Sequence, residues 1–301
     1  MKIRLLISAV CLLSPVAMAF NPPTPGPGPT DPPPDGPVAC TDKDLQPGET
    51  TRTINVGGQR REYVMYVPES YNNASETPLM LDFHALMTSA DYQIENSGTR
   101  EVADEEGFIV AYPQGVDNAW NLGPCCTESR AVDDVGFARA VVEEVSAQAC
   151  VDEKRVYATG YSNGGGMAYT LACRAADMFA AVAPAAFDMI EETACEPSRP
   201  VSVFAARGTR DSIVPFEGGE STPPTRYRLD PITFLGAEGS LEKWADINNC
   251  SGTATDMGNN CKGYSNCDGD TEAVLCTARL GGHKAWDAQA SWNFLKDHAL
   301  P

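Results

Sequence analysis

One serine lies in a sequence setting that favours nucleophilic chemistry. The segment Gly160-Tyr161-Ser162-Asn163-Gly164 follows a β-rich run, residues 156–159, and precedes a stretch with helical character up to Cys173. A strand that turns directly into a helix strains its central residue, and glycines on either side avoid collisions there. The helix N-terminus under the serine also favours the anion of an acyl transfer. We therefore expect Ser162 to be a nucleophile; helix capping is the alternative.

A serine hydroxyl needs a base, and the sequence contains three histidines. The strand, Gly-x-Ser-x-Gly and helix pattern is typical of α/β hydrolases, in which serine, acid and histidine follow in that chain order. His283 follows the last predicted strand on a glycine-rich turn, whereas His84 precedes the serine and His298 falls in the last predicted helix. The chain order therefore selects His283 as the base.

The acid that orients the histidine should follow the strand before the histidine's own strand. Residues 201–206 are predicted to form that strand, and Asp211 comes shortly after it. Asp188 and Glu191 follow an earlier strand and are the alternatives. Asp211 is therefore the predicted acid.

Ester chemistry also needs two N–H donors for the developing oxyanion. The amide of Asn163 directly follows the nucleophile, and the amide of Leu86 lies in the loop after the predicted strand 79–83. His84, in that same loop, is interpreted as a structural hydrogen-bonding residue. Three aromatic side chains near the predicted mouth of the active site are candidates for stacking on the substrate, namely Trp120, Tyr161 and Trp286. Core packing is the alternative for each.

Strand and helix patterns alternate along the chain, which predicts an α/β fold with a mostly parallel central sheet and helices on both faces. Apolar residues at helical spacing favour a helix over residues 133–149, and another is expected over 287–298. The predicted strands cover residues 63–67, 79–83, 107–112, 155–159, 179–184, 201–206 and 272–278.

The N-terminal part differs in composition from the rest. Residues 1–19 have a basic start, a short apolar run and a small-x-small end, which is typical of a signal peptide. A lipid anchor on Cys11 is the alternative. Residues 20–39 are rich in proline and form a predicted linker, and residues 40–301 form one predicted catalytic domain. The protein should therefore be secreted, with the periplasm as the alternative.

The net charge and the cysteine content limit the possible partners. A net charge of −19 without a basic cluster argues against nucleic acid. No long apolar run follows the leader, so no membrane contact is expected, and we expect a monomer. Of 11 cysteines, one leaves with the leader. The ten remaining cysteines are even in number and include no Cys-x-x-Cys pair, which favours disulfides over a zinc site. The ten candidates are Cys40, Cys125, Cys126, Cys150, Cys173, Cys195, Cys250, Cys261, Cys267 and Cys276.

Several segments together resemble one family: the strand and loop at His84, and residues 107–115, 132–137, 155–166, 208–215 and 281–286. In that order they are similar to the feruloyl esterase and polyhydroxybutyrate depolymerase group of secreted α/β hydrolases, which includes acetylxylan esterases and LpqC-type proteins. The resemblance covers nearly all of residues 40–301. It implies a disulfide-braced α/β-hydrolase fold, a triad of Ser162, Asp211 and His283, and no metal or organic cofactor.

The chain departs from the family pattern at a few positions. Ala85 replaces a glycine after the histidine of the oxyanion loop, which puts donor placement there in doubt. Arg207 replaces a histidine, and Trp286 is not followed by proline. Both are expected near the substrate mouth without touching the triad.

The resemblance further suggests disulfide pairings. Cys125 and Cys126 would join Cys150 and Cys173, and Cys40 would pair with Cys195. The remaining cysteines, Cys250, Cys261, Cys267 and Cys276, would pair among themselves.

Three functions are compatible with these features. The first is release of ferulate or acetate from plant cell-wall polysaccharide. The second is hydrolysis of a polyester, either polyhydroxybutyrate or an aromatic polyester of the PET type. The third is non-catalytic binding at a surface, which an intact triad disfavours. The predicted partner is in each enzymatic case an ester-bearing polymer or oligomer.

Overall fold

The computed structural model describes residue 40 and residues 43–127, 131–221 and 231–301. The predicted signal peptide, residues 1–19, and the predicted linker, residues 20–39, lie outside the described residues. Within the described ranges, no helix has the length and apolar character that crossing a membrane requires.

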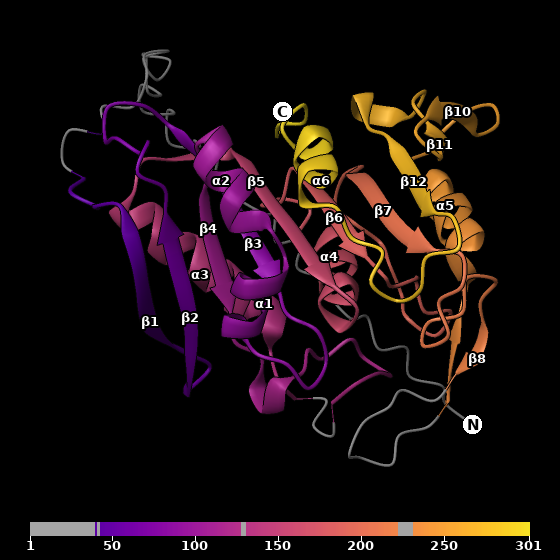
Figure 1. Cartoon of the computed structure of the whole chain (residues 1–301), viewed down its shortest axis with the longest axis horizontal. Helices are drawn as coiled ribbons and strands as arrows, with labels where there is room; N and C mark the ends of the chain where they lie inside the picture. The colour runs from indigo at the N-terminus through magenta and orange to yellow at the C-terminus, as the bar shows by residue number, and fades with distance from the viewer. Residues whose placement is uncertain (1–39, 41–42, 128–130, 222–230) are drawn as a thin grey trace, which may run out of the picture. The chain divides into compact units, whose positions relative to one another are not determined.

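A ten-stranded sheet forms the centre of the fold, in the order β1-β2-β4-β3-β5-β6-β7-β12-β11-β10 (Figure 1). The strands from β4 to β12 run parallel, and the strands at both edges are antiparallel. The parallel strands are β4 (Ile109–Pro113), β3 (Thr77–Phe83), β5 (Val151–Tyr161), β6 (Ala181–Ala185), β7 (Ser202–Gly208) and β12 (Ala273–Ala278). The edge strands are β1 (Gly48–Val56), β2 (Gln59–Val67), β11 (Cys261–Tyr264) and β10 (Thr255–Gly258). A separate ribbon pairs β8 (Gly219–Ser221) with β9 (Ile232–Phe234).

Helices cover both faces of the sheet. One face carries α1 (Ala90–Asn96), α2 (Thr99–Glu106) and α6 (Ala288–Leu295), and the other carries α3 (Asp134–Gln148), α4 (Asn163–Arg174) and α5 (Gly236–Ile247). Two 3-10 turns, η1 (Val116–Asn118) and η2 (Asp268–Asp270), lie in loops. Each face buries its own apolar cluster, with Trp292 stacked on Phe108 on one side and Trp244 buried on the other. Burial of these two faces is the main favourable term in folding.

The predicted fold class is confirmed, since a mostly parallel sheet lies between two helical layers. Every strand predicted from a buried apolar run corresponds to a strand of the central sheet. Helix α3 begins where the sequence indicated, because the Asp133 side chain caps it by accepting a hydrogen bond from the Gly136 amide at 2.8 Å. The elements without a prediction include β1, α1, α2 and α5. Strand β1 was missed because it is exposed and has no apolar run.

The structure pairs all ten predicted cysteines, but it corrects several pairings. The bonds are Cys40–Cys150, Cys125–Cys126, Cys173–Cys195, Cys250–Cys267 and Cys261–Cys276. The expected links from Cys125 and Cys126 to Cys150 and Cys173 were wrong, as was Cys40 with Cys195. Spacing along the chain does not report which loops the fold brings together. The pairing of the last four cysteines among themselves agrees with the structure.

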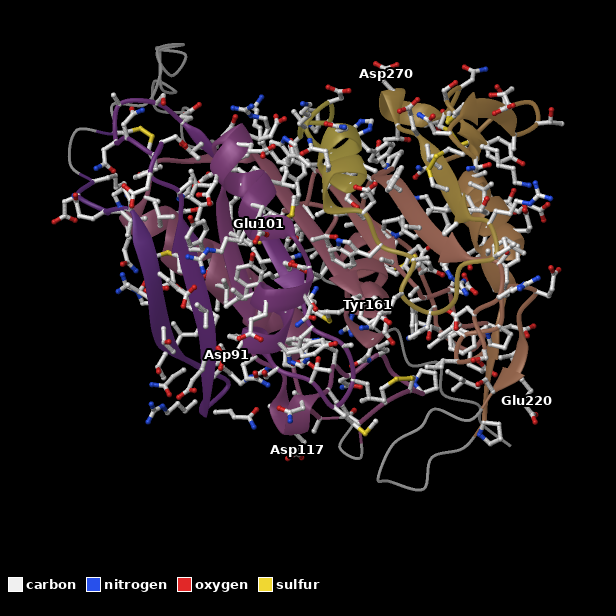
Figure 2. The ribbon with its side chains drawn as sticks, viewed as in Figure 1. Asp91, Glu101, Asp117, Tyr161, Glu220 and Asp270 are labelled. Carbon is white, nitrogen blue, oxygen red and sulfur yellow. A yellow bond between two sulfur atoms is a disulfide. The ribbon has the colours of Figure 1, made fainter. Side chains whose placement is uncertain are left out.

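Most acidic residues in the described ranges lie on the surface. Figure 2 labels five of them, and each is exposed: Asp91, Glu101, Asp117, Glu220 and Asp270. Tyr161, labelled in the same view, is half-buried at the end of β5.

Candidate active site

The predicted site residues follow the carboxyl ends of four parallel strands. His84 follows β3, Ser162 follows β5, Asp211 comes after β7, and His283 comes after β12. Because these strands are parallel, their carboxyl ends meet at one edge of the sheet. The topology therefore brings four distant parts of the chain to one place.

Ser162 forms the turn between β5 and α4. Its backbone is strained, with φ 54° and ψ −120°, and its amide donates to the Ala185 carbonyl oxygen at 2.9 Å. A methyl group at Gly164 would collide with the Phe83 carbonyl oxygen, and one at Gly160 would collide with the Gly164 carbonyl oxygen. The glycines therefore allow the tight approach that holds the serine at the sheet edge.

The serine, histidine and acid form a continuous line of hydrogen bonds. His283 Nε2 lies 2.9 Å from Ser162 Oγ, and His283 Nδ1 lies 2.8 Å from Asp211 Oδ2. The histidine side chain is 14% exposed and the Asp211 side chain is fully buried. A histidine held in this way can take the serine proton while the carboxylate stabilises the resulting imidazolium.

Asp211 stays ionised although it is buried. Burial raises the pKa of its carboxyl, but hydrogen bonds from His283 and from the Ile213 and Val214 amides outweigh burial and lower it below the usual 3.8. Those amides lie 2.9 and 3.0 Å from Asp211 Oδ1. Of the alternative acids, Asp188 is buried and pairs with Arg207, and Glu191 is exposed, whereas the carboxylate hydrogen-bonded to His283 is that of Asp211.

We call residues 207–214 the acid loop. At its start, the fully buried Arg207 forms an ion pair with Asp188, and it donates to the Val214 carbonyl oxygen at 2.8 Å. Its Nη2 also lies 3.8 Å from Asp211 Oδ2. The expectation that Arg207 does not touch the triad was therefore wrong, because its long side chain turns into the core instead of toward the mouth.

We call residues 84–88 the oxyanion loop, and a buried neutral histidine supports it. The Gly115 amide donates to His84 Nε2 at 2.9 Å, so Nδ1 carries the proton and donates to the Ala85 carbonyl oxygen at 2.8 Å. Burial lowers the pKa of His84 from 6.5 to about 4. His84 thus has the structural surroundings expected of it. Ala85 does not adopt a positive φ, so its methyl group causes no backbone strain.

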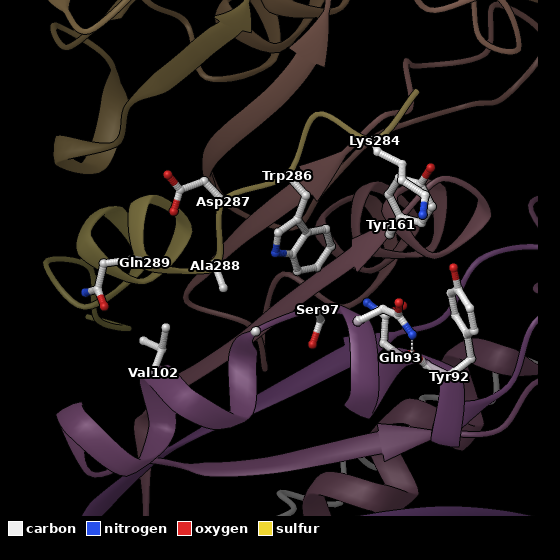
Figure 3. A pocket seen from close by; sticks show the side chains of 12 residues that line it. Tyr92, Gln93, Ser97, Val102, Tyr161, Lys284, Trp286, Asp287, Ala288 and Gln289 are labelled. Carbon is white, nitrogen blue, oxygen red and sulfur yellow. Dashed lines mark hydrogen bonds between the residues drawn. The ribbon is translucent and has the colours of Figure 1, made fainter. Parts of the chain in front are cut away.

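The three predicted aromatic residues divide into two kinds. Trp120 is fully buried, packs at 5.0 Å from the Phe83 ring, and donates from Nε1 to the His84 carbonyl oxygen at 2.8 Å. Its predicted role in substrate binding was wrong, because the side chain has no exposed surface. Tyr161 and Trp286, in contrast, line an open hollow, and Figure 3 shows them side by side there.

Ser162 opens into a first hollow of about 220 Å³ with largely apolar walls. Both predicted oxyanion donors, Leu86 and Asn163, line it together with His283. The bonded pair Cys125–Cys126 forms part of the wall. Sequence reasoning missed these further wall residues: Met87, Phe187, Ile213, Val214 and Phe234. Ile213 and Val214 could have been found from their position beside Asp211, whereas the others carry no local signal.

The chain matches the family model described as Esterase PHB depolymerase over residues 61–216, which is more than half of the sequence. It is 39% identical over 251 residues to feruloyl esterase B of Piromyces equi, covering 80% of this chain and 46% of that protein. It is 35% identical over 301 residues to the Nocardia uniformis subsp. tsuyamanensis protein named "Putative esterase NocK", covering 93% and 86%. The chain thus spans about half the length of the first of these relatives.

Solved structures agree on the fold. An acetyl xylan esterase from Aspergillus awamori superimposes with a TM-score of 0.60 at 13% identity, covering 82% of this chain and 99% of the other. A thermostable esterase superimposes with a TM-score of 0.56 at 17% identity, covering 84% and 63%. At such low identity the likeness concerns the fold alone.

Proposed function

This chain belongs to the Esterase PHB depolymerase family of carboxylic ester hydrolases, and from that premise we propose a secreted serine esterase that releases feruloyl or acetyl groups from plant cell-wall polysaccharide. Ser162, His283 and Asp211 are its proposed catalytic residues. The observation that carries the proposal is the unbroken hydrogen-bonded line from Asp211 through His283 to Ser162.

The proposed mechanism has two halves. Ser162 Oγ attacks the ester carbonyl carbon while His283 Nε2 takes its proton, and the amides of Asn163 and Leu86 stabilise the oxyanion. The C–O bond to the alcohol then breaks, and His283 returns the proton to the leaving oxygen. Water next attacks the acyl-enzyme with His283 again as base, which releases the acid and regenerates the serine.

The walls of the first hollow support an acyl group of aromatic or small apolar character. Phe187 and Phe234 are buried side chains of this wall, with their rings 5.2 Å apart. The Cys125–Cys126 pair adds further apolar surface. A feruloyl ring would bury apolar area against this surface, which favours binding by roughly 25 cal/mol per Å² buried. The name of the Piromyces equi relative is consistent with this acyl group.

A polyester is the second candidate substrate, and one observation favours it. Met87 and Ile213 line the hollow and are 61% and 45% exposed, so apolar side chains stand at its rim. Such a rim can lie against the surface of a solid polyester. The family name is in line with this possibility.

Secretion rests on two features. Five disulfides among the described residues are typical of an oxidising compartment. The leader of residues 1–19 has the pattern of a signal peptide. We propose that residues 20–39 then serve as a linker, and that residues 40–301 act as a monomeric catalytic domain.

A paired assay tests the proposal. Hydrolysis of p-nitrophenyl acetate by the wild type should fall by about 10⁴-fold or more in Ser162→Ala. A wild type that is inert toward every short ester would instead support a non-catalytic binding protein. Release from methyl ferulate, acetylated xylan, polyhydroxybutyrate film and aromatic polyester film, measured side by side, then separates the two substrate classes.

A further inference from the structure

The bonded pair Cys125–Cys126 in the wall of the first hollow differs in kind from the other disulfides. Its two cysteines are neighbours in the chain, whereas the other four bonds among the described residues join cysteines 15 to 110 residues apart. A disulfide stabilises a fold mainly by restricting the unfolded chain, and it does so more when the loop is longer. A bond between neighbours closes almost no loop, so stabilisation of the fold does not account for it.

We propose that this pair is a thiol–disulfide exchange site through which small dithiols alter the acyl selectivity of the esterase. The oxidised pair keeps the wall of the first hollow in shape, and the reduced pair lets it relax. The effect on selectivity rests on the proposed function, but the exchange itself does not depend on catalysis.

The location of the pair defines the class of reagent. Both cysteines line the hollow that also contains Ser162 and His283. Their residues are only 1% and 3% exposed, so the active site of a protein reductant cannot reach the sulfur atoms. The approach that remains leads through the hollow, and its volume of about 220 Å³ admits a small molecule.

The backbone at Cys126 shows what the bond holds in place. Cys126 has φ 83°, a left-handed conformation that residues with a side chain rarely adopt. Cleavage of the bond frees Cys126 to return to an ordinary negative φ, and this moves the wall beside Phe187. A feruloyl ring must lie along that wall, whereas an acetyl group reaches little beyond Ser162 and the oxyanion donors.

The start of this segment is anchored independently of the bond. The Asn121 amide donates to Asp134 Oδ2 at 2.8 Å, and its side chain donates to the Val132 carbonyl oxygen at 2.9 Å. The Gly123 amide donates in turn to Asn121 Oδ1 at 3.1 Å. Reduction should therefore change the wall locally and leave the triad assembled.

The exchange proceeds in two steps. A thiolate of the dithiol attacks one sulfur of the pair, which forms a mixed disulfide and releases the other cysteine as a thiolate that takes up a proton. The second thiol of the reagent, as its thiolate, then attacks the mixed disulfide and closes a cyclic disulfide. The pair gains two electrons and two protons, and the dithiol loses them. Oxidised glutathione reverses the exchange, and the two thiols remain neighbours, so their bond re-forms within one segment.

Two esters with one leaving group test the proposal: p-nitrophenyl ferulate and p-nitrophenyl acetate. The ratio of their kcat/KM values reports on the acyl side alone. Treatment with dithiothreitol should lower this ratio by about threefold or more, and oxidised glutathione should restore it. Labelling with iodoacetamide, followed by mass spectrometry, identifies whether Cys125 and Cys126 have become thiols.

Two variants serve as controls. Cys125→Ala/Cys126→Ala keeps the other four bonds, so the same treatment should leave its ratio unchanged. Ser162→Ala should be labelled at the pair as the wild type is, because the exchange needs no nucleophilic serine. The circular dichroism spectrum checks that the treated proteins stay folded.

Three results would overturn the exchange site. The pair could stay unlabelled while other disulfides open, it could be labelled without a change in the ratio, or the ratio of Cys125→Ala/Cys126→Ala could fall as much as that of the wild type. No cleavage of either ester by the oxidised wild type would instead overturn the proposed function, and labelling of the pair in Ser162→Ala would still support the exchange.

Discussion

The two loops that flank Ser162 are held in place by different physics. The oxyanion loop depends on the neutral His84, which joins the Gly115 amide to the Ala85 carbonyl oxygen inside the protein. The acid loop depends on charge, because Arg207 is paired with Asp188 and lies near Asp211. Both supports are buried, and neither touches the substrate hollow.

The difference follows from what each loop has to present. The oxyanion loop presents a backbone amide, so neutral hydrogen bonds that hold its shape are sufficient. The acid loop presents a carboxylate that must remain ionised although burial disfavours its charge. Hydrogen bonds from His283 and from the Ile213 and Val214 amides offset that cost. Two neighbouring loops can therefore be held by different kinds of interaction when one presents a neutral amide and the other an ionised carboxylate.

Removal of the positive charge of Arg207 should destabilise the acid loop and give the largest effect. Arg207→Met leaves Asp188 buried without its partner, and we expect the free energy of unfolding to fall by about 3–5 kcal/mol. Urea denaturation measures this loss. The matched variant Arg207→Met/Asp188→Leu removes both charges and should recover at least half of it. A loss below about 1 kcal/mol in the single variant would contradict the ionic support.

Removal of His84 should damage the oxyanion loop at the level of catalysis. His84→Ala deletes the hydrogen bonds of the ring to the Ala85 carbonyl oxygen and the Gly115 amide, and misplacement of the Leu86 amide should lower kcat by about 10²-fold. The measurement is kcat on p-nitrophenyl acetate, with the circular dichroism spectrum as a check of folding. His84→Gln retains a carbonyl acceptor for the Gly115 amide and should lose less. Equal kcat in all three proteins would disprove a supporting role.

The neutral character of His84 predicts a specific pH dependence. Its pKa is lowered from 6.5 to about 4, so unfolding takes up a proton between these values. The stabilisation is complete above pH 6.5 and is lost as the pH falls toward 4, by about 2–3 kcal/mol. Denaturation series at pH 7 and pH 4 should show a smaller loss for His84→Gln than for the wild type, because glutamine does not titrate. Identical losses would contradict a buried neutral imidazole.

A smaller effect is expected when both loops stay intact and only the wall of the first hollow changes. Cys125→Ala/Cys126→Ala removes apolar sulfur surface beside Ser162 and should lower the preference for feruloyl over acetyl esters by about threefold to tenfold. The ratio of kcat/KM for methyl ferulate and p-nitrophenyl acetate measures it. Cys261→Ala/Cys276→Ala removes a disulfide outside the hollow, so it should lower the melting temperature and leave this ratio unchanged.

The sequence by itself determined the α/β class, the family and the residues that the structure joins at the site. These inferences rest on local patterns and chain order. A glycine-flanked turn from strand to helix exposes its central residue, which here is Ser162, and parallel strands bring the residues that follow them to one edge. Ser162, Asp211 and His283 could therefore be selected without knowledge of any distance.

Only the tertiary structure decided which side chains are buried and which distant ones meet. It buried Trp120 behind the oxyanion loop, joined Cys125 to its neighbour, and turned Arg207 toward Asp188. It also placed Tyr92 and Trp286, which are far apart in the chain, on one hollow. Such contacts depend on how helices pack on the sheet and on where long side chains find space, and neither composition nor spacing records these.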